Sequence, residues 1–256
     1  MLIKDFVLRI PYLPSIVFYG KILRIVFSGS SKAKRGQYDT AAWCESSLAT
    51  VDALKAVGGH VEITGTEHFK KLEGPCVFIA NHMSALETFV LPHIIAPFKD
   101  VTFVIKQSLI EYPVFKHIMR SRDPITVGRS NPRDDLRAVL EGGAERLKRG
   151  TSIIVFPQTT RSVVFDPATF NTIGVKLAKK AGVPIVPIAL KTDVLRSQGK
   201  YVKEFGAVDP SKKTYFAFGE PLRVHGRGDE EQSKIIAFIL SKQKEWKERK
   251  EREDGS

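Results

Sequence analysis

A histidine and a glutamate five residues apart are the residues of this chain best suited to acid–base chemistry. His82 and Glu87 lie in the stretch Cys76–Thr88, where an apolar run, Cys76–Ala80, is followed directly by polar residues. Ligands of α/β proteins bind at the carboxyl ends of strands, and a histidine there can act as a general base when an acid fixes its ring. Five residues of regular helix turn about 500°. The pair can therefore meet only if His82 precedes the helix and its ring folds back over the first turn.

Two simpler explanations compete with catalysis for this pair. Ser84-x-x-Glu87 is a capping box, in which the glutamate satisfies a free N–H group at the start of a helix without any chemistry. His82 could also be a structural histidine whose hydrogen bonds are satisfied at the end of a strand. The spacing alone leaves these alternatives open beside the catalytic hypothesis.

Other apolar runs end in residues that suit a phosphate-bearing substrate. The run that ends at Phe156 is followed by Pro157 and a loop that carries a glutamine, two threonines, an arginine and a serine. Hydroxyls and backbone N–H groups bind phosphate oxygens, and arginine offers them a planar fork. Taken singly, each of these residues is also typical of a solvated loop. The candidate substrate-binding residues are Lys106 and Arg129, which each follow their own apolar run, and Gln158, Thr159, Thr160, Arg161 and Ser162.

The elements that must position these residues alternate along the chain. Strand-length runs rich in Val, Ile and Phe are bounded by Gly, Pro or charged residues, and helical patterns lie between them. This alternation predicts a layered α/β domain with a mainly parallel or mixed sheet flanked by helices. The expected strands are Cys76–Ala80, Val101–Ile105, Ser152–Phe156, Ile185–Leu190 and Tyr215–Phe218, and the expected helices are Ala41–Val57, one from about Ser84, 131–150, 171–181 and one from about Asp229.

The two ends of the chain are expected to differ from this domain. Residues 1–27 combine apolar stretches with basic residues, and their longest uncharged run is shorter than the roughly 20 residues of a membrane span. This composition favours a helical segment in the interface of an anionic membrane, with a true span and a buried helix as alternatives. Ser28–Gly36 is typical of a flexible basic connector. The expected organisation is residues 1–36 as membrane-associating segment and connector, 37–241 as the main domain, and 242–256 as a charged tail.

The formal net charge of +12 favours anionic binding partners. A basic field attracts lipid headgroups, nucleic acid or an acidic protein that carries the substrate. The cations gather at the chain ends instead of alternating with aromatic residues, so no specific nucleic acid is expected. The sequence has no CxxC or HExxH spacing, and no metal site is expected. Cys44 and Cys76 are expected to be free thiols of a reducing compartment.

The order of these motifs resembles that of the glycerolipid acyltransferase superfamily, and most closely its 1-acylglycerol-3-phosphate acyltransferases. The resemblance extends over roughly Val61–Pro221. A lone HxxxxE or FPxxTR spacing would be weak, whereas four blocks in the family's order are specific. These blocks are Asn81-His82-x4-Glu87, Lys106 with Gly128-Arg129, Phe156–Ser162 and Val183–Ile188.

The resemblance implies that a fatty acyl group moves from acyl-CoA or acyl carrier protein to the free hydroxyl of 1-acylglycerol-3-phosphate, giving phosphatidic acid without a further cofactor. His82 would deprotonate that hydroxyl and Glu87 would hold the ring. Arg129 and Arg161 would bind the phosphate of the lyso-lipid, with the Gln158–Ser162 loop around its glycerol oxygens. The resemblance also implies an N-terminal membrane-binding element and peripheral attachment to an anionic membrane surface, on the cytoplasmic face.

The chain departs from the family pattern in two places. The commoner acid of the family is Asp, where this chain has Glu87, a difference of one methylene. The family motif FPEGTR has a carboxylate and a glycine where this chain has Gln158 and Thr159, so the charge and backbone freedom of the loop differ. The acceptor could therefore be another lyso-lipid such as lyso-ornithine lipid, or the chain could be a catalytically degenerate lipid-binding protein. The lack of a GxSxG motif fits direct transfer without an acyl-enzyme.

Overall fold

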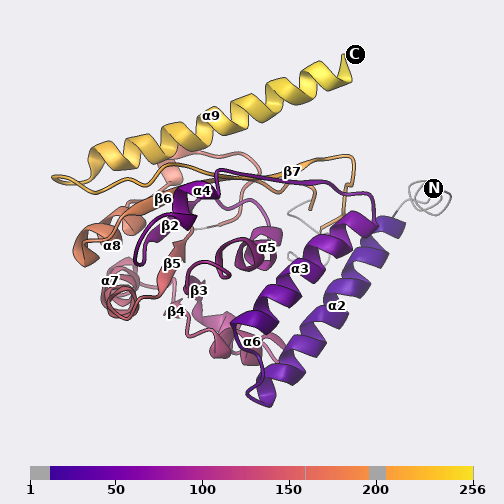
Figure 1. The fold of residues 1–256 in the computed structure, drawn as a ribbon, viewed down its shortest axis with the longest axis horizontal. Helices are drawn as coiled ribbons and strands as arrows, with labels where there is room; N and C mark the ends of the chain where they lie inside the picture. The colour runs from indigo at the N-terminus through magenta and orange to yellow at the C-terminus, as the bar shows by residue number, and fades with distance from the viewer. Residues whose placement is uncertain (1–11, 159, 196–205, 256) are drawn as a thin grey trace.

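A seven-stranded sheet forms the centre of the protein in a computed structural model that describes residues 12–158, 160–195 and 206–255 (Figure 1). The strand order is β1-β7-β6-β2-β5-β3-β4, and every neighbouring pair is parallel except β6 and β7. The mainly parallel sheet expected from the sequence is confirmed. The strands are β1 (Val61–Thr64), β2 (Val77–Ala80), β3 (Val101–Lys106), β4 (Ile125–Val127), β5 (Ser152–Val155), β6 (Ile185–Lys191) and β7 (Thr214–Phe218).

The central strands are continuous apolar runs because both of their faces are covered. Successive side chains of β2 enter opposite cores: Val77 and Ile79 pack on one side of the sheet, and Phe78 and Ala80 on the other. Helices α2, α3 and α5 contribute to the core around Phe78, whereas α7, α8 and α9 contribute to the core around Ile79. The helices are α2 (Leu13–Lys34), α3 (Thr40–Ala56), α4 (Glu67–Lys70), α5 (Leu86–Ile95), α6 (Phe115–Ser121), α7 (Pro132–Lys148), α8 (Ile173–Ala181) and α9 (Asp229–Asp254), with the 3₁₀ turns η1 (Gln107–Ile110) and η2 (Pro167–Thr169).

The expected flexible connector is instead the last part of a helix. Helix α2 continues to Lys34 and lies beside α3 (Figure 1). Gly29 and Ser30 are buried, and a Cβ added at Gly29 would lie 3.0 Å from the Tyr38 ring and 3.1 Å from Ile118. The small residues that predicted a linker therefore allow the helix to pack closely, and the prediction was wrong for residues 28–34.

The segment expected to be a charged tail, 242–256, is helical as far as Asp254. Helix α9 passes through residue 242 without a break and runs along one side of the molecule (Figure 1). Trp246 is buried and stacks on Tyr215 of β7, with ring centroids 5.0 Å apart. Arg249 forms an ion pair with Glu62 of β1 at 2.8 Å. These contacts fasten the second half of α9 to the edge of the sheet.

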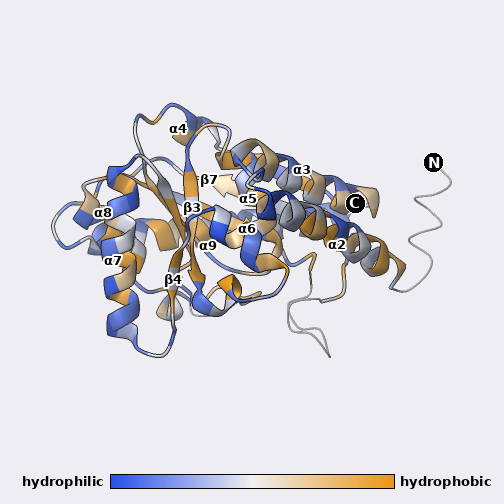
Figure 2. Cartoon of the chain, turned by 90° about the horizontal axis from the view of Figure 1, so that it is seen from below, coloured by the Kyte–Doolittle hydropathy of each residue, from blue (hydrophilic) through white to orange (hydrophobic). Residues whose placement is uncertain are grey.

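Helix α2 has two apolar faces. Phe18, Ile22 and Val26 are buried in the core, at the four-residue spacing of one helix face. Large apolar side chains at other positions are exposed, and Figure 2 shows that hydrophobic residues recur along this helix. Residues 1–11, the first part of the expected membrane segment, lie outside the described residues. Within residues 12–255, apart from the two gaps, no helix is both long enough and apolar enough to cross a membrane. The exposed side chains are Tyr12, Ile16, Leu23 and Phe27.

Candidate active site

The candidate residues meet at the carboxyl edge of the sheet. His82 follows β2, the loop that begins at Pro157 follows β5, and Thr192 follows β6 directly. Because β5, β2 and β6 are parallel neighbours, their ends lie side by side. This edge is the common ligand site of α/β sheets. The sheet order therefore places several polar side chains together.

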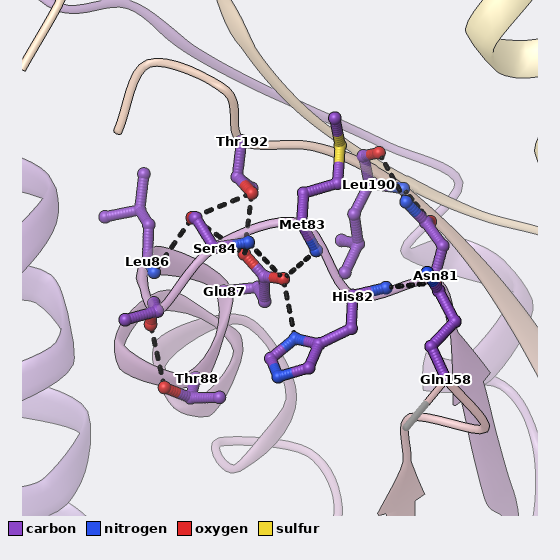
Figure 3. A network of polar contacts seen from close by, with 11 residues as sticks. Asn81, His82, Met83, Ser84, Leu86, Glu87, Thr88, Gln158, Leu190 and Thr192 are labelled. Atoms are coloured by element: carbon purple, nitrogen blue, oxygen red, sulfur yellow. Dashed lines mark hydrogen bonds and ion pairs between the residues drawn. The ribbon is translucent and has the colours of Figure 1, made fainter. Parts of the chain in front are cut away.

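His82 and Glu87 form a hydrogen bond, in the one geometry that their spacing allows. The distance from His82 Nδ1 to Glu87 Oε1 is 2.9 Å (Figure 3). His82 lies before α5, which begins at Leu86, and its ring folds back over the first turn where Glu87 is located. The His82 side chain is 12% exposed and the Glu87 side chain is fully buried. The pair is thus shielded from water but open at the ring.

The Glu87 carboxylate also accepts hydrogen bonds from the chain that precedes the helix. Its Oε1 accepts the N–H of Met83 at 2.7 Å and that of Ser84 at 3.0 Å. The Ser84 contact is one half of the predicted capping box, so the capping and pairing roles coexist. Burial raises the pKa of Glu87, but the hydrogen bond and charge of His82 and the hydrogen bonds of Thr192 and Ser84 outweigh it and lower the pKa below its ordinary value. The carboxylate is therefore ionised at neutral pH.

The imidazole is held flat against an aromatic side chain. Phe156, at the end of β5, stacks on His82 with ring centroids 4.3 Å apart and planes 20° apart. With Nδ1 hydrogen-bonded to Glu87, the other ring nitrogen, Nε2, points away from the carboxylate (Figure 3). In the neutral tautomer that donates Nδ1–H to a carboxylate, Nε2 carries no proton. This arrangement suits Nε2 to accept a proton from a bound hydroxyl.

The loop after β5 forms hydrogen bonds with both the N–H and the carbonyl of His82. The N–H of His82 donates to Gln158 Oε1 at 2.7 Å, and the N–H of Ser162 donates to the His82 carbonyl at 2.9 Å. Gln158 is 4% exposed. The Ser162 hydroxyl donates to the Val164 carbonyl at 2.6 Å. Both residues thus make contacts within the protein that the sequence did not predict, and their contact with a substrate stays a prediction.

Asn81 links the segment between β2 and α5, residues 81–85 (the catalytic loop of the proposed reaction), to β6. Its side-chain amide makes the two hydrogen bonds that a backbone amide of a neighbouring strand would make. Its side-chain Nδ2 donates to the Leu190 carbonyl at 2.9 Å, and its Oδ1 accepts the Leu190 N–H at 2.8 Å. The regular pairing of β2 with β6 ends at Ala80 and Ile188. The two amide hydrogen bonds therefore extend that pairing up to the residue before His82.

The cations expected to bind the acceptor are distributed unequally around His82. Arg161 adjoins Ser162, whose N–H contacts His82. Lys106 ends β3 and is exposed. Arg129 follows the edge strand β4, which is three strands from β2, or about 14 Å at about 4.8 Å per strand. Its backbone has φ 60° and donates to the Asp135 carboxylate at 3.0 Å.

Two loop residues complete the set of predicted contacts. Thr160 is exposed, next to Arg161. Thr159 lies outside the described residues. The structure therefore brings His82, Glu87, Gln158 and Ser162 together, while the roles of the cations and threonines toward a substrate stay predictions.

A family model described as "Acyltransferase" matches residues 60–191, which is more than half of the chain. The chain belongs to the acyltransferase family. It is an O-acyltransferase, and the resemblance seen in its motifs is confirmed. The matched residues include His82, Glu87 and the loop after β5.

Relatives and a solved structure agree with this assignment. The acyltransferase is 28% identical over 204 residues to a 1-acyl-sn-glycerol-3-phosphate acyltransferase of Pseudomonas aeruginosa, a match that covers 80% of this chain and 73% of that protein. It is 33% identical over 141 residues to an enzyme of the same name from Chlamydomonas reinhardtii, covering 55% of this chain and 41% of the algal protein. The crystal structure of the acyltransferase PlsC from Thermotoga maritima superposes with a TM-score of 0.68 at 19% identity, covering 95% of this chain and 97% of that chain. This last comparison supports the fold.

Substitutions of Gln158 test whether this residue of the acyltransferase positions the His82 backbone or binds the acceptor. In Gln158→Leu the buried N–H of His82 loses its acceptor, and we expect kcat to fall about tenfold while the KM for the acceptor changes little. Gln158→Glu keeps an oxygen at this position and should retain most of the rate. Steady-state kinetics on both variants measure this split. A raised acceptor KM at unchanged kcat would instead show that Gln158 binds the acceptor.

Proposed function

We propose that this acyltransferase moves a fatty acyl group from a thioester to the free hydroxyl of 1-acylglycerol-3-phosphate and so forms phosphatidic acid. The observation that carries the proposal is the buried hydrogen bond of 2.9 Å between His82 Nδ1 and Glu87 Oε1, which leaves Nε2 turned away from the carboxylate (Figure 3). The names of the relatives from Pseudomonas aeruginosa and Chlamydomonas reinhardtii supply the acceptor. The base and the acceptor hydroxyl together supply the nucleophile that attacks the acyl thioester.

The reaction proceeds by direct transfer. Nε2 of His82 takes the proton of the acceptor hydroxyl while its oxygen attacks the thioester carbonyl carbon. Glu87 stabilises the imidazolium that forms, because its ionised carboxylate faces Nδ1 at 2.9 Å. The carbon–sulfur bond of the tetrahedral intermediate then breaks, and the thiol takes the proton back from His82. This sequence needs no metal, prosthetic group or nucleophilic serine.

The acceptor's phosphate would lie near the loop after β5. Arg161 carries a guanidinium beside the segment that contacts His82, and arginine binds phosphate oxygens in a bidentate manner. Lys106 and Arg129 add positive charge farther along the same edge of the sheet. A dianionic headgroup is attracted by this charge, and its glycerol hydroxyl would then approach His82.

The acyltransferase would work at a membrane surface. Ile16, Leu23 and Phe27 on α2, with Tyr12 directly before it, expose apolar side chains, and the net charge of +12 favours anionic lipid headgroups. Peripheral attachment to the cytoplasmic face would give access both to the lyso-lipid and to acyl-CoA or acyl carrier protein. Both donors are acidic and would meet the same basic surface.

A second acceptor deserves a test because the loop after β5 lacks the family's carboxylate. Gln158 is neutral, and its Oε1 is engaged by the His82 backbone. A lyso-lipid with a different headgroup, such as lyso-ornithine lipid, could therefore be the preferred substrate for the same chemistry. A catalytically degenerate lipid-binding protein is disfavoured by the intact hydrogen bond between His82 and Glu87.

A panel of lyso-lipids distinguishes these functions. Purified enzyme with labelled acyl-CoA or acyl carrier protein is offered 1-acylglycerol-3-phosphate, lyso-ornithine lipid and lysophosphatidylcholine in mixed micelles. The proposal expects phosphatidic acid to form with the highest kcat/KM. A higher kcat/KM for lyso-ornithine lipid would show that this lipid, and not 1-acylglycerol-3-phosphate, is the preferred acceptor. The absence of transfer to any acceptor from either donor would overturn the proposed function.

A further inference from the structure

A threonine 105 residues away in sequence contacts the acid of the catalytic pair. Thr192 directly follows β6, and its Oγ1 donates to Glu87 Oε2 at 2.6 Å (Figure 3). Both side chains belong to fully buried residues. An ionised carboxylate only accepts hydrogen bonds, so the hydroxyl proton of Thr192 is directed at Glu87. Such charge-assisted bonds are shorter and stronger than neutral ones.

The two oxygens of the Glu87 carboxylate share the N–H of Ser84, at 3.0 and 3.1 Å, and differ in their other partners. Oε1 accepts from the His82 ring at 2.9 Å and from the Met83 N–H at 2.7 Å. Oε2 contacts Thr192 Oγ1, and Ser84 Oγ lies 3.0 Å from it. The carboxylate is thus fixed at one end to the catalytic loop and at the other end to β6. A carboxylate held at both oxygens cannot rotate about its last bond without breaking a contact.

The length of the Glu87 side chain explains why such a fixed point is needed. The side chain starts from the first turn of α5 and reaches back to His82 while also touching the segment after β6. An aspartate at this position would be one methylene shorter, and we expect it to lose one of the two contacts unless the backbone moves. The extra rotatable bond of glutamate must also be immobilised for the ring to keep one orientation.

We infer that Thr192 is a positioning residue of the acyl-transfer site, whose hydroxyl fixes the longer acid Glu87 so that the His82 ring keeps the orientation needed for proton transfer. Its effect passes through Glu87 and not through the substrate. The inference rests on the proposed function, because its kinetic tests measure acyl transfer. It assigns the residue after β6 to the same site as the residues after β2.

A double-mutant cycle tests this coupling. Thr192→Val removes the hydroxyl at nearly constant volume, and Thr192→Ser keeps the hydroxyl. We expect Thr192→Val to lower kcat about tenfold with the acceptor KM unchanged, and Thr192→Ser to restore at least half of the rate. In a Glu87→Asp background, where we expect the Thr192 hydroxyl to lose the carboxylate and keep only Ser84 as its partner, Thr192→Val should change kcat less than twofold.

The pH–rate profile gives a readout that a purely structural role would not affect. Removing a donor makes the carboxylate more basic, so the pair of His82 and Glu87 takes up a proton at higher pH. The other groups in contact with the carboxylate are hydroxyls and backbone amides. The acid limb of kcat/KM should therefore move to higher pH in Thr192→Val and return in Thr192→Ser. A variant that melts earlier but keeps kcat and the acid limb would overturn the inference.

Failure of the proposed function is recognised separately. The Nδ1 proton of His82 is followed by NMR in wild type and in Thr192→Val without any substrate. The inference expects the hydrogen-bonded Nδ1 resonance to shift or broaden in Thr192→Val and to recover in Thr192→Ser. Wild-type enzyme without transfer to any acceptor would overturn the proposed function alone, and an unchanged resonance in Thr192→Val would overturn the inference.

Discussion

Changing His82 to alanine should lower kcat for acyl transfer by about 10²–10⁴-fold, the usual contribution of a positioned general base. The physical reason is that Nε2 takes the acceptor's proton in the proposed reaction, whereas the hydrogen bonds that join His82 to the loop after β5 are made by its backbone, to Gln158 and Ser162. The loop should therefore stay in place when the ring is removed. Acyl transfer from labelled donor, with circular dichroism and vesicle binding measured on the same sample, tests the expectation.

A histidine on the same helix as Glu87 provides the matched control. His93 lies in the last turn of α5, and its described hydrogen bond is made by its backbone N–H to Ser47 Oγ at 2.9 Å. His93→Ala removes an imidazole of the same size and should leave kcat within about twofold of wild type. Wild-type turnover in His82→Ala would exclude His82 as the base.

The second large effect is expected from neutralising Glu87. Glu87→Gln keeps the size of the side chain but replaces a charged oxygen that accepts hydrogen bonds with an NH₂ group that accepts none, although backbone N–H groups of Met83 and Ser84 donate to this carboxylate. Charge-assisted hydrogen bonds are lost and a buried donor is left unpaired, so unfolding at pH 7 should become easier by about 3 kcal/mol. The imidazolium also loses its counter-charge, and kcat should fall together with stability. Urea unfolding followed by circular dichroism measures the first effect.

The stability difference should depend on pH in one direction. The pKa of Glu87 in the folded protein is lowered below the ordinary value of 4.5. The unfolded chain therefore binds the proton more readily, and the contribution of the carboxylate is fully present above pH 4.5 and is lost as pH falls through the folded pKa. The gap between wild type and Glu87→Gln should narrow in acid. Glu73→Gln, at an exposed loop position, serves as control and should show no such gap.

The fold was predictable where burial on both faces leaves a continuous apolar run, as in Val77–Ala80 and Ile185–Lys191. It was less predictable at the edges of the sheet. Val61–Thr64 forms β1 with half-exposed residues, and its short pattern did not predict a strand. Ser28–Lys34 has the composition of a linker, but Gly29 is small because Tyr38 and Ile118 approach it closely. Small residues such as glycine and serine occur both in flexible linkers and in closely packed helices, so composition alone does not distinguish the two.

The site shows the same limit. His82 and Glu87 could be predicted because they share one local segment whose geometry admits a single way to meet. Thr192 could not, because it is 105 residues from Glu87 and no motif marks a threonine after a strand. The placement of Gln158 against the His82 backbone depends on the neighbouring ends of β2 and β5. Contacts between strand ends are a property of the sheet order, which the local sequence does not contain.

The side-chain pairing of Asn81 with Leu190 ties the catalytic loop to the cooperative folding unit of the sheet. Loops usually open in local fluctuations that leave the core intact. Here the residue before His82 carries two hydrogen bonds that continue the ladder of β2 and β6, and both residues are buried. Opening this part of the site therefore requires the end of a central strand pair to open with it. Amide hydrogen exchange at His82 should therefore be about as slow as in the ends of β2 and β6.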